Sequence, residues 1–146
     1  MPIVNFHLVA GTSTPEQDER LLGRASALYA EVLASPIERV RAFITPHDPE
    51  QFAVAGELAS VSGQHAPFFD FIVLDGRPLD QRQQLMRGFT DLLVEVLGVR
   101  RERVRGCCRR VDPVDWSIGG EPASELRRSE IAARAEAAAA AGGHGA

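Results

Sequence analysis

The chain carries the same order of apolar and polar positions twice. Residues 2–11 align without gaps on residues 67–76, and both segments are short apolar runs that end in a glycine and a polar turn, as strands do. After each turn, apolar residues recur with the i, i+1, i+4, i+7, i+8 spacing of an amphipathic helix with one broad apolar stripe. The matching stripes are Leu21, Leu22, Ala25, Leu28, Tyr29, Val32 and Leu33 in the first copy and Leu85, Met86, Phe89, Leu92, Leu93, Val96 and Leu97 in the second.

A second strand and a glycine-containing ribbon follow each predicted helix. Residues 38–41 and residues 102–105 both read Glu-Arg-Val-Arg and open the second strand. We therefore expect one domain over residues 1–128, made of repeat 1 (2–63) and repeat 2 (67–128). Residues 129–146 are rich in alanine and then in glycine, which predicts a tail that is helical first and disordered afterwards.

The order of these elements predicts the fold class. A strand–helix–strand crossover makes its two strands parallel and places the helix on one face of the sheet. Two tandem βαβ units with pseudo-twofold symmetry therefore predict an α/β (α+β) fold, in which a four-stranded sheet has both helices on one face and a β-hairpin follows each unit. Because the strand at residues 68–74 is apolar on both faces, we expect the open face of the sheet to be buried in an oligomer.

The composition of the chain argues against membrane, nucleic-acid and metal partners. Hydrophobic residues make up 45% of the 146 residues, but no apolar run approaches the ~20 residues that cross a bilayer. No signal-peptide pattern is visible, so we expect a cytoplasmic protein with no membrane partner. A formal net charge of −4 argues against a nucleic-acid partner. The only cysteines, Cys107 and Cys108, are adjacent and lack metal-ligand spacing, so we expect no metal site.

The chain contains no lysine, because all 16 of its basic residues apart from histidine are arginines. No side chain can therefore serve as an amine base. The candidate amine is the N-terminus, which is Pro2 if Met1 is removed. Pro67 stands at the duplicated position, but its nitrogen is an amide within the chain, so the repeat predicts one working site per chain.

These residues resemble a known family. Residues 2–11, Pro-Ile-Val-Asn-Phe-His-Leu-Val-Ala-Gly, resemble the opening of 4-oxalocrotonate tautomerase, and residues 116–128 resemble the C-terminal hairpin of that family. Residues 52–60 are a weaker copy of the hairpin. The chain is similar to the fused, double-length members of the tautomerase superfamily, and Asp115-Trp116-Ser117 particularly resembles malonate semialdehyde decarboxylase.

The resemblance implies a function and a set of site residues. It implies a cofactor-independent isomerase, a keto–enol tautomerase that acts on a small anionic 2-oxo or 2-hydroxy-enoic carboxylic acid and forms a homotrimer. The proline would be the general base, one arginine would bind the carboxylate, another would bind a second carboxylate and polarise the carbonyl, and an aromatic residue would form an apolar wall. The residues at these positions are Pro2, Arg77, either Arg41 or Arg105, and Trp116 in preference to Phe52.

The chemistry explains why these residue types suit the reaction. A terminal amine has a reference pKa of about 8 and is mostly protonated at pH 7. An apolar pocket beside arginines disfavours the cationic form and lowers that pKa, so the amine can accept a proton near neutrality. Arginine also binds a carboxylate through two parallel hydrogen bonds and keeps its charge.

Departures from the family pattern leave alternatives open. Hydrolytic dehalogenases of the superfamily carry a glutamate and an arginine where this chain has Ile118 and Leu74, which argues against hydration of a haloacrylate. A cofactor-independent decarboxylase of a 3-oxo acid is the enzymatic alternative, although Leu79 replaces its second arginine and only Glu38 is near its aspartate position. If Met1 is retained, Pro2 is an amide, and the chain would be a non-catalytic binding or assembly module.

Overall fold

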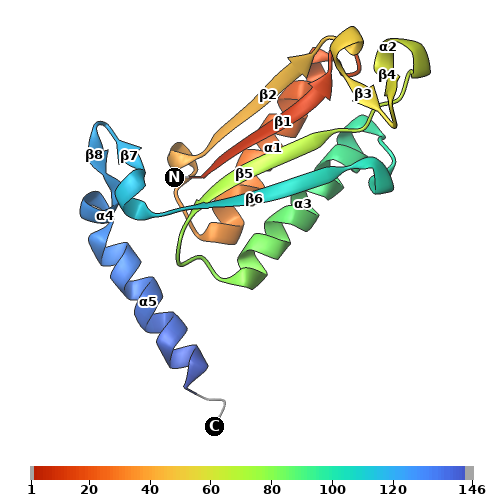
Figure 1. Cartoon of the computed structure of the whole chain (residues 1–146). Helices are drawn as coiled ribbons and strands as arrows, with labels where there is room; N and C mark the ends of the chain where they lie inside the picture. The colour runs from red at the N-terminus through yellow and green to blue at the C-terminus, as the bar shows by residue number, and fades with distance from the viewer. Residues whose placement is uncertain (1, 144–146) are drawn as a thin grey trace.

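Two copies of a strand–helix–strand unit form the body of the protein (Figure 1). The computed structural model describes residues 2–143. Each strand of the units has 7 residues and each helix has 19, so the two copies match element by element. Their bounds are β1 (Ile3–Val9), α1 (Pro15–Leu33), β2 (Arg41–His47), β5 (Phe68–Leu74), α3 (Leu79–Leu97) and β6 (Arg105–Val111).

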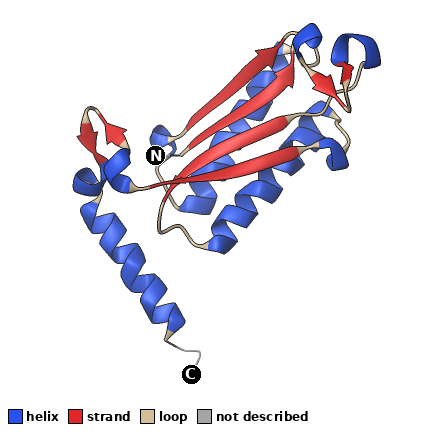
Figure 2. Ribbon diagram, in the orientation of Figure 1, coloured by secondary structure: helices blue, strands red, loops and turns tan. Residues whose placement is uncertain are grey.

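The six elements form two layers. The strands make one sheet in the order β2-β1-β5-β6, and both long helices cover the same face of it (Figure 2). β1 and β2 are parallel, β5 and β6 are parallel, and the central pair β1 and β5 is antiparallel, with Ile3 opposite Ile72 and His7 opposite Phe68. The predicted fold class, with its pseudo-twofold symmetry, is confirmed.

A short hairpin follows each unit, and the two hairpins lie at opposite ends of the sheet (Figure 1). The hairpin of the second copy lies at the end where the chain begins. Beyond it, the last helix extends away from the body. The bounds of these elements are β3 (Ala53–Val54), β4 (Glu57–Leu58), α2 (Ala59–Ser62), β7 (Ser117–Ile118), β8 (Glu121–Pro122), α4 (Ala123–Leu126) and α5 (Arg128–Gly142).

Single 3-10 turns precede β2, β6 and both hairpins. They are η1 (Ile37–Arg39), η2 (Pro49–Gln51), η3 (Arg101–Arg103) and η4 (Pro113–Asp115). Of the tail predicted to be helical and then disordered, α5 is the helical part, and residues 144–146 lie outside the described residues. No helix within residues 2–143 is long and apolar enough to cross a membrane.

The first long helix begins at the capping box that its sequence predicts. Thr14 Oγ1 accepts a hydrogen bond from Gln17 N at 3.2 Å, and Gln17 Oε1 accepts one from Thr14 N at 2.9 Å. Proline occupies the first helical position, where no N–H is needed. The local sequence thus satisfies amides that the start of a helix leaves unpaired.

The apolar stripes of both helices pack on the sheet in one core. Five large aromatic side chains are fully buried at its centre and pack edge to face or offset, namely Phe6, Tyr29, Phe69, Phe71 and Phe89. Tyr29 also donates its hydroxyl proton to the carbonyl of Ile72, and its oxygen is 3.4 Å from the carbonyl oxygen of Ile3. The second copy has Leu93 at this position. Tyr29 therefore connects α1 to β1 and β5 at the end of the sheet that carries Pro2.

The open face of the sheet is more polar than the sequence predicted. His7 Nδ1 is 2.8 Å from His47 Nε2, and His7 Nε2 is 3.5 Å from Asp70 Oδ1. Asp70 also pairs with Arg109 at 3.0 Å. Phe43 on the same face keeps 48% of its surface exposed. Among residues 2–143, no helix covers this face of the sheet (Figure 2).

At one core position the two copies distribute side-chain volume differently between paired strands. In the first copy Val4 pairs with Ala42, and at the equivalent place in the second copy Phe69 pairs with Gly106. A Cβ atom on Gly106 would overlap the Phe69 ring, which is 1% exposed and has little room to move. The Phe69 ring therefore fits only because Gly106 has no side chain.

We predict that Gly106→Ala lowers the free energy of unfolding by about 1–3 kcal/mol, because it overpacks the core against Phe69. Combining it with Phe69→Val recreates the pair of the first copy, so the double variant loses less than the sum of the two single losses. Urea unfolding of the four proteins measures this cycle. Strictly additive losses would contradict the packing explanation.

Candidate active site

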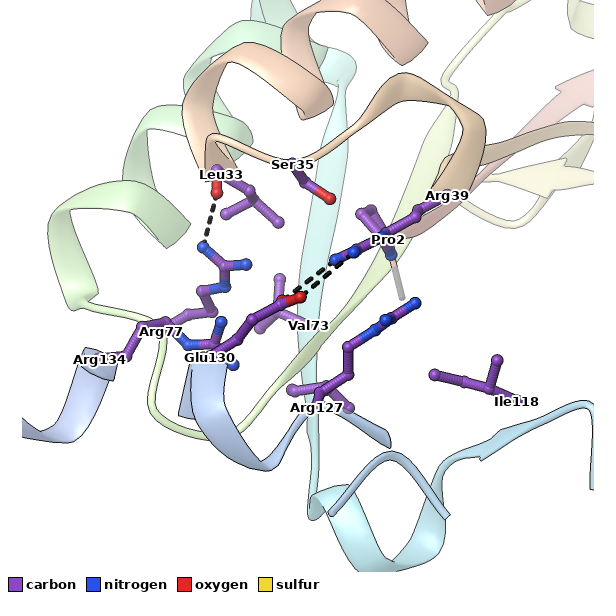
Figure 3. Close-up of a pocket in the computed structure, with 11 residues that line it drawn as sticks. Pro2, Leu33, Ser35, Arg39, Val73, Arg77, Ile118, Arg127, Glu130 and Arg134 are labelled. Carbon is purple, nitrogen blue, oxygen red and sulfur yellow. Dashed lines mark hydrogen bonds and ion pairs between the residues drawn. The ribbon is translucent and has the colours of Figure 1, made fainter. Parts of the chain in front are cut away.

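Pro2 is buried at the end of the sheet where β1 begins. Its carbonyl accepts a hydrogen bond from the amide of Arg41 at 3.0 Å, which continues the β1–β2 ladder. Because β1 runs antiparallel to β5, the start of β1 meets the end of β5 and the loop after it. A cavity opens there (Figure 3), lined by Pro2, Leu33, Ser35, Arg39, Val73, Leu74, Arg77, Ile118, Arg127, Glu130 and Arg134.

Arg77 reaches this cavity from the turn that follows β5. The turn needs Gly76, whose φ of +92° is a left-handed conformation that side chains disfavour. The Arg77 Nη1 donates to the carbonyl of Leu33, at the end of α1, at 2.8 Å. Burial, and then the nearby charge of Arg134, lower the pKa of the Arg77 guanidinium, which stays charged. A fixed cation therefore stands in the cavity with Pro2.

Arginine dominates the charge of the cavity. Its lining holds four arginines and one carboxylate, that of Glu130. The Arg39 guanidinium binds both oxygens of Glu130, at 3.1 and 3.2 Å (Figure 3). This contact holds the pKa of the Glu130 carboxyl below its ordinary value of 4.5. The remaining positive charge suits an anionic ligand.

The uncharged part of the lining is apolar. Val73 and Leu74 come from β5, and Ile118 comes from the hairpin of the second copy. The resemblance implies that Leu74 and Ile118 stand where hydrolytic relatives carry an arginine and a glutamate. In this cavity neither position offers a group that could activate water.

Two of the residues predicted from the sequence, Pro2 and Arg77, lie in one cavity. Trp116 lies just before β7 and does not line the cavity, although Ile118 of the same hairpin does. Its Nε1 is buried and has no hydrogen-bond partner within residues 2–143. Phe52 belongs to the hairpin at the other end of the sheet and packs against His47.

Arg41 and Arg105 do not line the cavity with Pro2. Each begins the second strand of its copy, and each donates from Nη1 to two nearby backbone carbonyls at 2.7–3.1 Å. Arg41 is at the Pro2 end of the sheet. Arg105 is at the opposite end, where its amide bonds to the carbonyl of Pro67. Both side chains are exposed.

Sequence reasoning missed four of the charged residues in the cavity. Arg39 lies in the repeated Glu-Arg-Val-Arg run, where only its neighbour Arg41 matched the family pattern. Glu130 and Arg134 are four residues apart, a spacing that places both on one face of the predicted tail helix and could have indicated a shared contact. The fourth is Arg127.

The cavity contains no obvious metal site. Within residues 2–143, no three His, Cys, Asp or Glu side chains lie close enough together to hold a metal ion. The arrangement therefore offers binding of an anion by arginines next to a buried proline.

Comparison with known proteins identifies the family. The family model described as tautomerase enzyme matches residues 2–61 and again residues 67–125. The chain belongs to the tautomerase family. It is an isomerase of the 4-oxalocrotonate tautomerase type, built from two copies of the family unit. Each match covers one strand–helix–strand unit with its hairpin.

Individual relatives agree with this assignment. A 2-hydroxymuconate tautomerase of Pseudomonas sp. (strain CF600) is 40% identical over 60 residues, which are 41% of this chain and 94% of that protein. The crystal structure of Pt0534 inactivated by 2-oxo-3-pentynoate has a TM-score of 0.78 at 20% identity, over 85% of this chain and 98% of that chain. The F6 fused 4-OT asymmetric trimer has a TM-score of 0.77 at 21% identity, over the same shares. This tautomerase thus has the double-length fold.

The Arg39–Glu130 pair predicts a pH response. Since the Glu130 pKa is lowered, the pair stabilises the docked helix above pH 4.5, and this stabilisation is lost as the pH falls through the lowered value. We expect Arg39→Ala to move the Glu130 pKa back toward 4.5, as followed by ¹³C NMR of its carboxyl carbon. An unchanged midpoint would mean that Arg39 is not the group that holds the carboxylate.

Proposed function

We propose that this tautomerase interconverts the enol and keto forms of a small 2-hydroxy-enoic acid, with the amine of Pro2 as the general base. The observation that carries the proposal is the burial of Pro2 in one cavity with Arg77, an excess of arginines and an apolar wall. The proposal requires that Met1, which lies outside the described residues, is removed.

The reaction needs one group that moves a proton in both directions. The Pro2 amine takes the proton of the enol hydroxyl, and the oxygen keeps the electron pair and forms the carbonyl. The carbon–carbon double bond shifts, and the far carbon takes the proton from the Pro2 ammonium. The amine ends uncharged, so no cofactor or co-reactant is consumed.

The surroundings of Pro2 favour its basic form. Nearby guanidinium groups repel an ammonium ion, and the apolar side chains of Val73, Leu74 and Ile118 offer it no hydration. Both effects lower the pKa of a terminal amine from its reference value of about 8. Arg77 would bind the substrate carboxylate, and charge that develops on the carbonyl oxygen would be stabilised by a second arginine.

The lining supports tautomerisation over the enzymatic alternatives. Addition of water is disfavoured, since Leu74 and Ile118 present hydrocarbon to the cavity. The decarboxylase alternative gains no support, because Leu79 is 55% exposed at the start of α3 and is not in the lining. Trp116, with its unpaired Nε1, would complete the wall on the hairpin side.

We also infer a homotrimer. The open face of the sheet carries the exposed side chain of Phe43, and the F6 fused 4-OT relative is a trimer. Arg41 and Arg105 begin the edge strands β2 and β6 at opposite ends of the sheet. Either would serve as the carbonyl-polarising arginine only across a subunit interface, at the Pro2 site of a neighbour.

Sedimentation equilibrium tests the trimer. The expected mass is about three times the 15.8 kDa of the chain. Phe43→Asp places a charge on the open face and should shift the protein toward monomer. Leu79→Asp is the matched control, because Leu79 is also exposed but lies at the start of α3, in the helical layer. A monomeric wild-type protein, or equal effects of the two variants, would count against the interface.

Ketonisation of 2-hydroxymuconate or phenylenolpyruvate tests the general base. We expect Pro2→Ala to lower kcat/KM by about 100-fold or more, because the positioned secondary amine is lost. The change is followed by the ultraviolet absorbance of the enol. Unchanged turnover would refute the role of Pro2 and would favour a non-catalytic module.

Two controls make this test specific. Pro67→Ala changes the same residue type at the duplicated position, where the nitrogen is an amide, and should leave turnover close to that of the wild type. Intact mass then establishes whether Met1 is absent, and 2-oxo-3-pentynoate should add to the chain at Pro2. A mass that includes Met1 would exclude the free amine.

A further inference from the structure

Arg39 lies in the Pro2 cavity but has no role in the family pattern. It is the last residue of η1, two residues before Arg41, and its side chain points toward Glu130, in the cavity that Pro2 and Ser35 also line (Figure 3). Its carboxylate partner, Glu130, comes from α5, 91 positions further along the chain. A contact over this sequence distance joins the last helix to the centre of the candidate site.

The Arg39–Glu130 contact has the geometry of a bound carboxylate. Nη1 of Arg39 is 3.1 Å from Oε2 of Glu130, and Nη2 is 3.2 Å from Oε1. These two parallel bonds are how a guanidinium recognises any planar carboxylate, including that of a small acid. Glu130 therefore supplies the chemical group that the rest of the cavity is suited to bind.

The cavity has no room for a substrate in this arrangement. Its free volume is about 30 Å³, enough for only about two water molecules. Part of its wall belongs to the sheet and to the end of α1, which the core holds in place. Further parts are Arg39 in η1, Arg77 in the turn after β5, and Ile118 and Arg127 near the second hairpin. The remaining wall is the first turns of α5, which carry Glu130 and Arg134. A larger groove of about 920 Å³ also borders Arg39, Arg77 and Glu130, but Pro2 does not line it. A six-carbon acid in that groove therefore reaches Pro2 only if this wall moves.

α5 is held loosely enough to move. None of its residues is buried, and the Glu130 side chain is 42% exposed. The same groove lies between α5, from Glu130 to Ala141, and the end of α1 and the start of α3. An exposed ion pair contributes little stability. Release of Glu130 from Arg39 thus costs little.

The opposite end of the sheet, where the second strand of the second copy begins, provides an internal comparison. Arg103 is equivalent to Arg39 by the repeat, and it has no carboxylate within ion-pair distance among residues 2–143. The chain after α2 returns directly into β5 and forms no long helix at that end. The carboxylate partner is therefore a feature of the Pro2 site alone, where a ligand is expected.

We propose that Arg39 is a carboxylate-binding residue of the Pro2 site and that Glu130 occupies it until the carboxylate of the substrate takes its place. This assignment rests on the proposed function for the identity of the substrate, but not for the exchange itself. The exchange makes α5 a competitor of the ligand. It also favours dianionic acids, because Arg77 and Arg39 then each receive a carboxylate.

Calorimetric titration with adipate, the saturated six-carbon dicarboxylate, tests the exchange without turnover. Glu130→Gln should bind adipate about twofold to fivefold more tightly than the wild type, the range expected for loss of one exposed competing ion pair. Glu136→Gln is the matched control, since it removes the same charge from an exposed position of the same helix. Arg39→Ala should weaken binding, and Arg39→Ala/Glu130→Gln should show no gain over it.

The outcomes separate this inference from the proposed function. Three results would overturn the exchange. The first is equal adipate affinity of Glu130→Gln and Glu136→Gln, the second is weaker adipate binding by Glu130→Gln than by the wild type, and the third is no adipate binding by any variant. In the ketonisation assay the same variant should lower KM more than it changes kcat. If no variant ketonises an enol but the adipate pattern holds, the proposed reaction fails and the role of Arg39 stands.

Discussion

The antiparallel pairing of β1 with β5 is the constraint on which the rest of the structure depends. It relates the two copies by a pseudo-twofold axis, with Ile3 opposite Ile72, and it brings the beginning of one copy to the end of the first strand of the other. Tyr29 reinforces this junction by its contacts to both strands. Because of this pairing, Pro2 meets Arg77 although 75 positions separate them along the chain.

The two copies share a backbone but differ in chemistry. The first supplies Pro2, the residue next to Met1, and the second supplies Arg77 and Ile118 to the same cavity. Pro67 is fully buried and lies within the chain, so its nitrogen is an amide whether or not Met1 is removed. Core positions diverged in the same way, as the exchange of Val4 and Ala42 for Phe69 and Gly106 shows. Duplication kept the fold, while the residues of the proposed site lie together at one end of the sheet.

The C-terminal helix adds to this site a charge that the family unit does not explain. Its alanine-rich sequence buries none of its residues, so packing contributes little to its position, and the Arg39–Glu130 pair is its clearest contact with the body. Such a helix can contribute a carboxylate to the cavity without closing it permanently. The ion pair at the site therefore holds α5 near the cavity, and the weak packing of α5 elsewhere leaves that helix able to move.

By itself, the sequence determined the repeat and the layer of two helices on a four-stranded sheet, because the periodicity of strands and helices and the handedness of the crossover follow from local patterns. The pairing of Pro2 with Arg77 was implied by the resemblance to the tautomerase family, and the tertiary structure brings both residues to one cavity. The sequence did not determine which arginines line the cavity. Arg41 and Arg105 matched a pattern, but strand alternation directs their side chains to the open face of the sheet. Arg39, Arg127, Glu130 and Arg134 come together only in the tertiary structure, because a helix that buries no residue leaves no periodic signal of where it docks.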